Sequence, residues 1–226
     1  MRKIVGSMEE LAQKIAAEFA AAAEKNPEAA FGFTAVDVPV PVLEAIAASG
    51  ADFSKAQAFN ACEYVGEAAD GVLSQAAKLR TALYEKTPFA SVHVPGEGED
   101  YDADIRAAGG LDLVLLGIGE RGHVAFCEPG ADFGSGTFTM KLADVTRKLA
   151  SAEFGSLEQT PTHGVTMGIA TLLNAKRILL IACGEEKANA VQKTLEGRPE
   201  TFIPASFLQL HTDVTLYLDP EAASKL

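Results

Sequence analysis

The run LDLVLL at residues 111–116 constrains the fold more than any other segment of this chain. Nearly all of its side chains are apolar, as in a strand that is covered on both faces. Residues 177–182 (RILLIA) repeat the pattern, and residues 214–218 (VTLYL) form a third predicted strand. Helical stretches lie between these strands, at residues 166–173 and 185–195. Strands that alternate with helices predict an α/β fold with three αβα layers, a Rossmann-like, doubly wound and mostly parallel sheet.

The first part of the chain continues this alternation. Ser7 and Glu10 have the spacing of a capping box, in which each side chain satisfies a free amide at the start of a helix. Apolar residues then recur every four positions until Asn26-Pro27 ends the predicted helix. Further strands are predicted at residues 30–36, 56–61 and 91–95, and further helices at residues 39–49 and 71–86. Since no repeat, linker or change of composition divides the chain, residues 1–226 are expected to form a single domain.

The composition excludes several classes of protein. The 226 residues include 19 Lys and Arg against 31 Asp and Glu, which gives a net charge of −12 at pH 7. With 48% hydrophobic and 22% charged residues, the chain is too apolar to be disordered. A nucleic-acid-binding protein needs clustered positive charge, and so does a protein that docks on an anionic membrane. We therefore expect neither nucleic acid nor membrane as a partner.

Signals for export and for covalent or metal cross-links are also missing. Residues 1–10 have a basic start without the apolar run of a signal peptide, and no window approaches the roughly 18 apolar residues of a membrane-spanning helix. Cys62, Cys127 and Cys183 are an odd set without the spacing of a zinc site. They are interpreted as reduced thiols, which predicts a cytoplasmic protein without a metal centre.

The ligand site of an open α/β sheet lies beyond the carboxyl ends of its strands. This rule directs attention to residues 34–39, 61–66, 117–129 and 183–187. In the third of these loops, Gly117, Gly119 and Gly122 let the backbone turn sharply, and His123 and Glu128 could make an acid–base pair. Two other readings stay open: a weak dinucleotide motif, since the glycines match G-x-G-x-x-G, and a tight turn whose histidine is satisfied internally.

Four segments, in this order, resemble the glucosamine-6-phosphate deaminase family, which includes galactosamine-6-phosphate isomerases and, more distantly, 6-phosphogluconolactonases. Residues 59–66 (FNACEYVG) look like F-N-x-D-E-Y-V-G, and residues 117–129 (GIGERGHVAFCEP) look like G-x-G-x-D-G-H-x-A-F-N-E-P. Residues 164–175 resemble A-L-T-x-G…L-L-x-A, and residues 205–211 (ASFLQLH) resemble A-S-x-L-Q-L-H. The resemblance covers most of the chain from about residue 56 onward.

The resemblance implies a reaction that needs no metal or other cofactor. Such an enzyme opens the ring of an amino-sugar phosphate, moves a proton between C1 and C2, and releases ammonia. On this basis His123 matches the ring-opening histidine, Glu128 a carboxylate that supports it, and Lys187 a lysine that contacts the phosphate. The further substrate-binding positions that match are Gly119, Gly122, Glu63 and Tyr64. The implied partner is a small molecule, a sugar phosphate or a related metabolite, and a homo-oligomer is possible.

The chain departs from the family pattern at positions that matter for this reaction. Cys62 stands where an aspartate serves as the base at carbon, and a thiol has a reference pKa of about 8.5 against about 3.9 for aspartate. Arg121 replaces an aspartate beside His123, and residues 36–39 (VDVP) replace a Gly-Gly-Thr-Pro phosphate loop. There Asp37 would repel a phosphate. A phosphate-binding arginine is missing near residue 152, although Arg147 lies nearby.

Three hypotheses about function follow. The first is a deaminase-like or isomerase-like enzyme of amino-sugar phosphate metabolism whose standard catalysis is impaired or altered, with His123, Glu128, Cys62 and Arg121 at the site. The second is a catalytically silent homologue that binds a small metabolite or a protein partner. The third is a 6-phosphogluconolactonase-like hydrolase. His163 and His211 are assigned to packing or hydrogen bonding, His93 to a structural role and Cys127 to packing. The acidic residues 97–104 are expected to form a solvated surface.

Overall fold

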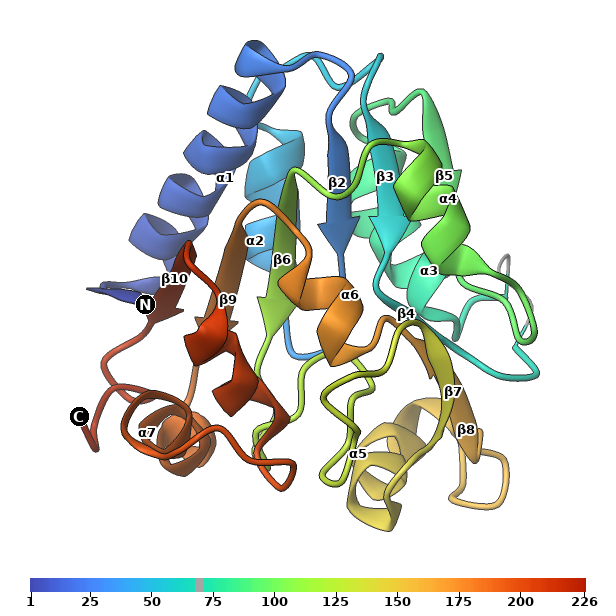
Figure 1. The fold of residues 1–226 in the computed structure, drawn as a ribbon, viewed down its shortest axis with the longest axis vertical. Coiled ribbons are helices and arrows are strands. Elements are labelled where there is room, and N and C mark those ends of the chain that lie inside the picture. Colours follow the sequence, from blue (N-terminus) through green and yellow to red (C-terminus); the bar gives the residue numbers. More distant parts are fainter. Residues whose placement is uncertain (68–70) are drawn as a thin grey trace.

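The computed structural model describes residues 1–67 and 71–226 of the chain. Within them a seven-stranded sheet forms the middle layer, and every neighbouring pair of its strands is parallel (Figure 1). Its spatial order is β1 (Arg2–Val5), β10 (Val214–Leu218), β9 (Ile178–Ala182), β6 (Leu113–Gly117), β2 (Ala30–Phe33), β3 (Gln57–Asn60) and β5 (Ser91–His93). Apart from β1 at one edge, the strands follow one another outward from the middle of the sheet, β2-β3-β5 on one side and β6-β9-β10 on the other, which confirms the predicted doubly wound α/β class.

Side chains that alternate along β6 enter two separate cores. Leu113 and Leu115 pack with α1 (Met8–Lys25), α2 (Val40–Ala47) and the π-helical turn η1 (Arg80–Tyr84). Val114 and Leu116 pack on the opposite face, in the core that also holds apolar side chains of five further helices. These are α4 (Tyr101–Ala107), α5 (Asp144–Phe154), α6 (Ile169–Leu173), α7 (Ala188–Glu196) and the 3₁₀ segment η3 (Pro204–Leu210). Burial on both faces is why the sequence of this strand is apolar without alternation.

A small antiparallel sheet, absent from the sequence prediction, lies at the carboxyl edge of the large one. Among the described residues it has the order β4 (Cys62–Tyr64), β8 (His163–Thr166) and β7 (Phe138–Lys141), and α5 (Asp144–Phe154) follows β7 (Figure 1). Thr166, expected to begin a helix, instead ends a strand and pairs with both Cys62 and Phe138. The helix starts only at Ile169.

Other boundaries also differ from the sequence prediction. The capping box at the start of α1 is confirmed, since the Ser7 side chain accepts from the Glu10 amide and the Glu10 carboxylate accepts from the Ser7 amide. The helix expected from residue 71 begins at Gln75 with α3 (Gln75–Leu79), because the Ser74 hydroxyl caps the Ala77 amide. The acidic run at residues 97–104 was expected to be a solvated surface, but part of it is not.

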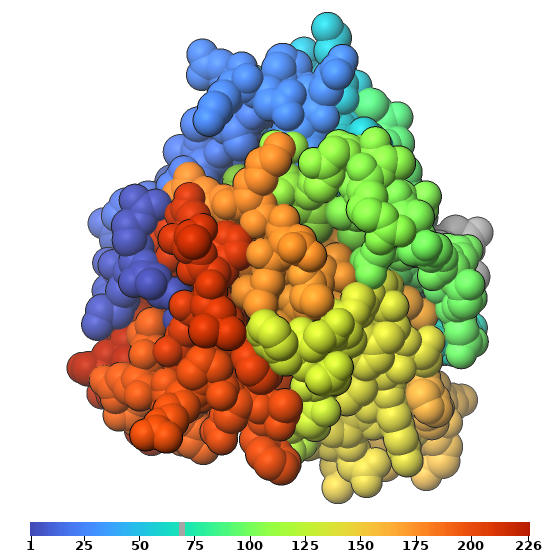
Figure 2. Space-filling view, viewed as in Figure 1, coloured from blue at the N-terminus to red at the C-terminus, as the bar shows by residue number. Residues whose placement is uncertain are grey.

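Within that run, Asp100 caps α4 and is exposed, whereas the Asp102 carboxylate is partly buried. It accepts hydrogen bonds from the amide and hydroxyl of Thr137 and from the hydroxyl of Thr171. Asp102 therefore ties α4 to the segment before β7 and to α6. In Figure 2 the segments after residue 185 (orange to red) and those of β7 and α5 (yellow) cover the lower part of one face, with residues of the loop after β6 between them.

Candidate active site

A cavity of about 230 Å³ lies at the carboxyl ends of the parallel strands. All four loops singled out in the sequence reach it, and α3 and α5 complete its wall. Its lining is Ala35, Val36, Asp37, Tyr64, Gln75, Lys78, Glu120, Arg121, His123, Phe126, Val145, Thr146, Leu149, Ala150, Glu153 and Lys187. The volume suits a ligand smaller than a typical drug molecule.

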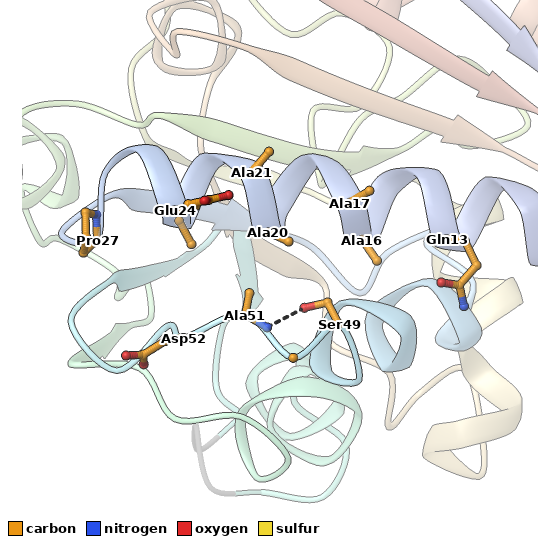
Figure 3. A pocket seen from close by; sticks show the side chains of 12 residues that line it. Gln13, Ala16, Ala17, Ala20, Ala21, Glu24, Pro27, Ser49, Ala51 and Asp52 are labelled. Atoms are coloured by element: carbon orange, nitrogen blue, oxygen red, sulfur yellow. Dashed lines mark hydrogen bonds between the residues drawn. The ribbon is translucent and has the colours of Figure 1, made fainter.

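A larger hollow of about 730 Å³ lies between α1 and residues 49–52 (Figure 3). Alanines of α1 form one side of its wall, and on the other side the Ser49 hydroxyl accepts a hydrogen bond from the Ala51 amide. None of the residues that the sequence motifs single out lines it. The smaller cavity is therefore the candidate active site, because convergent polar groups rather than size distinguish a functional pocket.

The Asp37 carboxylate bonds to two other residues that line this cavity. Its Oδ2 accepts a hydrogen bond of 2.9 Å from Nε2 of His123, and its Oδ1 accepts one from Nζ of Lys187. Burial disfavours the charged carboxylate, but the hydrogen bonds and positive charges of His123 and Lys187 outweigh it and lower the pKa of Asp37. The sequence placed all three residues at the site, but it did not anticipate that Asp37 would join the other two.

The glycines of the loop after β6 make this contact possible. A Cβ on Gly117 would lie 2.3 Å from the backbone carbon of Asp37, and a Cβ on Gly119 would lie 1.9 Å from Cε1 of His123. Gly122 has a positive φ of 77°, and a Cβ there would meet Ile203 at 2.7 Å. In this structure Gly119 and Gly122, predicted to bind substrate, make room for protein side chains instead of lining the cavity.

Cys62 is buried and does not line the cavity. It is 1% exposed, and its Sγ is 3.7 Å from the hydroxyl oxygen of Thr34. Burial raises the pKa of the Cys62 thiol far above neutral pH, and the hydrogen bond to Thr34 offsets only part of this effect. The side chain at this position is therefore a neutral thiol at pH 7.

The resemblance implies that Glu128 supports His123, but in the structure the Glu128 carboxylate bonds to the backbone instead. Its Oε1 accepts from the Ala143 amide at 3.1 Å, and its Oε2 is buried without a partner among the described residues. Nδ1 of His123 is likewise buried and unpartnered within residues 1–67 and 71–226. The carboxylate that bonds to the histidine is thus Asp37, which lies in the turn after the neighbouring strand β2.

Glu63 and Tyr64 lie at different depths. The Glu63 carboxylate is buried and accepts from the amides of Tyr64, Gln75 and Ala76, so it anchors the start of α3 and does not line the cavity. Tyr64 does line it, with its ring 4.9 Å from that of Phe126, and burial raises the pKa of its hydroxyl. Gln75, which the sequence motifs did not single out, stands beside Tyr64 in the wall.

The other cations around the cavity differ in how they are engaged. Lys78 pairs with Glu153 at 2.6 Å, and Arg121 is exposed at the rim beside Glu120. The Arg147 guanidinium donates to carbonyl oxygens of residues 157, 160 and 161 and does not line the cavity.

Over the described parts of the chain, no three His, Cys, Asp or Glu residues are grouped as metal ligands would be. None of the helices described is long and apolar enough to cross a membrane.

Comparisons with known proteins agree with the motifs. The chain matches the family of glucosamine-6-phosphate isomerases and 6-phosphogluconolactonase over residues 6–217. It is 39% identical over 208 residues to a glucosamine-6-phosphate deaminase of Latilactobacillus sakei subsp. sakei (strain 23K), an alignment that covers 89% of this chain and 88% of the relative. A glucosamine-6-phosphate deaminase of Clostridium botulinum (strain Hall) is 35% identical over 237 residues, with 99% and 97% covered.

Solved structures give the same result. A monomeric glucosamine-6-phosphate deaminase of the NagB superfamily superposes with a TM-score of 0.92 and 32% sequence identity, over 100% of both chains. A 6-phosphogluconolactonase from Shewanella baltica OS155 has a TM-score of 0.73 and 18% identity, over 97% of each chain, and shares the fold. The matched residues reach every strand of the large sheet except β1, and they include every loop that lines the cavity. The chain therefore belongs to the glucosamine-6-phosphate isomerase/6-phosphogluconolactonase family.

Proposed function

We propose that this protein is a glucosamine-6-phosphate deaminase-like member of amino-sugar phosphate metabolism in which standard deamination is impaired. One observation carries the proposal. The Asp37 carboxylate bonds to both His123 and Lys187, the residues that match the family's ring-opening histidine and phosphate-contacting lysine. Both groups are therefore engaged by the protein itself in the absence of a ligand.

The state of Cys62 supports the proposal. Moving a proton between two carbons needs a base that is deprotonated at neutral pH and touches the substrate. The Cys62 thiol is neutral, because burial raises its pKa, and it lies outside the cavity wall. Loss of such a base typically lowers a rate by about 10²–10⁴-fold.

The state of His123 also supports it. The Nε2–H of this residue donates to Asp37, and its other ring nitrogen is buried without a partner in the described chain. A sugar ring oxygen could use Nε2 only after displacing the Asp37 carboxylate. Since that carboxylate is also bonded to Lys187, displacing it would break two charge-assisted hydrogen bonds.

The same observations leave room for a silent homologue that binds a small metabolite. A lactonase-like activity has only the shared fold behind it, since the solved lactonase relative is 18% identical. Three assays separate these functions: ammonia release from glucosamine-6-phosphate, ammonia release from galactosamine-6-phosphate, and hydrolysis of 6-phosphogluconolactone. We expect deamination at a rate at least about 10²-fold below that of a family enzyme assayed in parallel.

A set of variants tests the cause of the impairment. Cys62→Asp with Arg121→Asp restores the two acidic side chains of the family pattern but leaves Asp37 bonded to Lys187. We expect it to recover little deaminase activity. Adding Asp37→Gly and Val36→Gly frees His123 and Lys187 and should raise the rate by about 10²-fold or more. Asp132→Asn, on an exposed aspartate outside the cavity, is the matched control. Robust turnover by the unchanged protein would overturn the proposal.

A further inference from the structure

We propose that the cavity takes an unphosphorylated amino sugar, a hexosamine, and that Asp37 is the residue that excludes its 6-phosphate. The inference rests on the proposed function, because it treats this cavity as the family's ligand site. It differs from that function in naming a ligand class that lacks the phosphate. Four observations on the cavity wall support it.

The position that would receive a phosphate is already filled by an anion. Both oxygens of the Asp37 carboxylate are engaged, one by Lys187 and one by His123. The Lys187 side chain is 12% exposed, so a phosphate could reach its ammonium only next to the Asp37 carboxylate. A phosphate and the Asp37 carboxylate, both negative and both partly shielded from water, would repel each other strongly if they contacted the same ammonium.

The remaining cations give little attraction for a phosphate. Lys78 is paired with Glu153, and Arg147 is committed to backbone carbonyls away from the cavity. Arg121 lies exposed at the rim, where solvent and salt screen its charge, and the neighbouring Glu120 carries the opposite charge. Thus none of the cations described around this cavity offers a buried and unpaired charge to an anion.

The wall instead presents unused hydrogen-bond acceptors. Gln75 lines the cavity, is 2% exposed, and its Oε1 has no hydrogen-bond partner among the described residues. A buried acceptor without a donor is costly, and a ligand that donates a hydrogen bond would remove the cost. Glu120 adds a carboxylate at the rim with no ion pair in the described part of the chain. Sugar hydroxyls and an ammonium group are donors of the required kind.

The rest of the wall suits the carbon face of a sugar. Tyr64 and Phe126 present aromatic rings, and α5 presents Val145, Leu149 and Ala150. Apolar and aromatic side chains beside convergent polar groups are typical of small-molecule sites. The cavity of about 230 Å³ has room for one monosaccharide. The combination of an apolar face, acceptors and a filled anion position selects an uncharged or ammonium-bearing sugar over its phosphate.

Calorimetry and thermal shift with four probes test the inference: glucosamine, galactosamine, glucose and glucosamine-6-phosphate. We expect the two amino sugars to bind more tightly than glucose, since only they carry the ammonium, and about tenfold more tightly than glucosamine-6-phosphate. Asp37→Asn, which removes the charge and keeps the shape, should narrow or reverse the preference for the unphosphorylated sugar. Asp132→Asn should leave it unchanged.

A second variant keeps the inference testable if Asp37→Asn does not fold. Gln75→Met preserves the length of the side chain but removes the acceptor, so it should weaken glucosamine binding by about tenfold while the protein stays folded by circular dichroism. Tighter binding of the phosphate than of glucosamine to the unchanged protein would overturn the inference, as would no binding of either amino sugar. If neither amino sugar binds and deamination is also absent, this inference fails while the proposed function stands. Rapid deamination of glucosamine-6-phosphate would overturn both the proposed function and this inference, because the phosphate would then have to occupy the cavity.

Discussion

Asp37 combines a backbone role and a charge role in one residue. Its φ of 56° lies in the left-handed region, where glycine is the usual residue and aspartate is among the side chains that tolerate it best. The resemblance puts a glycine-rich phosphate loop at this place in the chain. Aspartate therefore keeps the turn that a glycine would make, and it adds a carboxylate that reaches His123 and Lys187.

Removing the charge of Asp37 should destabilise the protein. Asp37→Asn keeps the side-chain shape but leaves the partly buried Lys187 ammonium without its ion pair. Breaking a fully buried pair typically costs about 3–5 kcal/mol, so we expect a loss below that range here. Urea unfolding at neutral pH measures this loss. The double variant Asp37→Asn/Lys187→Met also removes the unpaired cation, so it should recover part of the lost free energy of unfolding. If the two single changes were simply additive, Asp37 and Lys187 would not be coupled.

The same variant has a defined pH dependence. The pKa of Asp37 is lowered from 3.8 in the folded protein, so its carboxylate adds stability above pH 3.8. This stability is lost as the pH falls from 3.8 through the lower pKa that Asp37 has in the folded protein. The free energy of unfolding of the unchanged protein should therefore fall more between neutral pH and pH 3 than that of Asp37→Asn, which has no proton to gain at this position. Parallel pH dependences would contradict the ion pair.

At the scale of elements, the turn after β6 must pass unusually close to the turn after β2. Gly117 has the backbone of Asp37 where its own Cβ would be, at 2.3 Å. Gly117→Ala should therefore displace one of the two turns, lower stability by about 1–3 kcal/mol and separate Asp37 from His123. Gly134→Ala is the matched control, since its nearest atom would be 3.4 Å away. Chemical denaturation of both variants measures the difference, and equal stabilities would contradict the close approach.

The strands β6 and β9 could be predicted because each is a continuous apolar run, and β10 because Val214, Leu216 and Leu218 alternate along it. Neither signal needs knowledge of the neighbouring strands. The short strands β4 and β8 could not. Their residues are mixed in polarity, and their pairing joins Cys62 to Thr166, more than a hundred positions along the chain. Local propensity carries no information about such a partner, which is why Thr166 was expected in a helix.

At the scale of the whole molecule, strand order determines the site. Asp37 and His123 are 86 positions apart, yet they meet because β2 pairs with β6. Lys187 joins them because β9 pairs with β6 on its other side. The sequence located the loops through the rule on carboxyl ends, but the bonds among their side chains depend on an order of strands that local patterns do not contain.

The net charge of −12 makes a prediction about partners. At pH 7 and low salt the protein should pass through a heparin column without retention, because a polyanion repels an acidic surface. A basic nucleic-acid-binding protein on the same column is the control. Retention that salt reverses would show a clustered positive surface and contradict the expectation that nucleic acid is not a partner.

The bond between Asp37 and Lys187 also has a consequence for how the protein responds to its surroundings. The competing anion is part of the chain, so its effective concentration next to Lys187 is fixed by the fold and is not lowered by dilution. A free phosphate must exceed that concentration, which for a tethered group is on the order of millimolar or more, before it takes its place. Small changes in the concentration of free phosphate should therefore leave Lys187 bonded to Asp37.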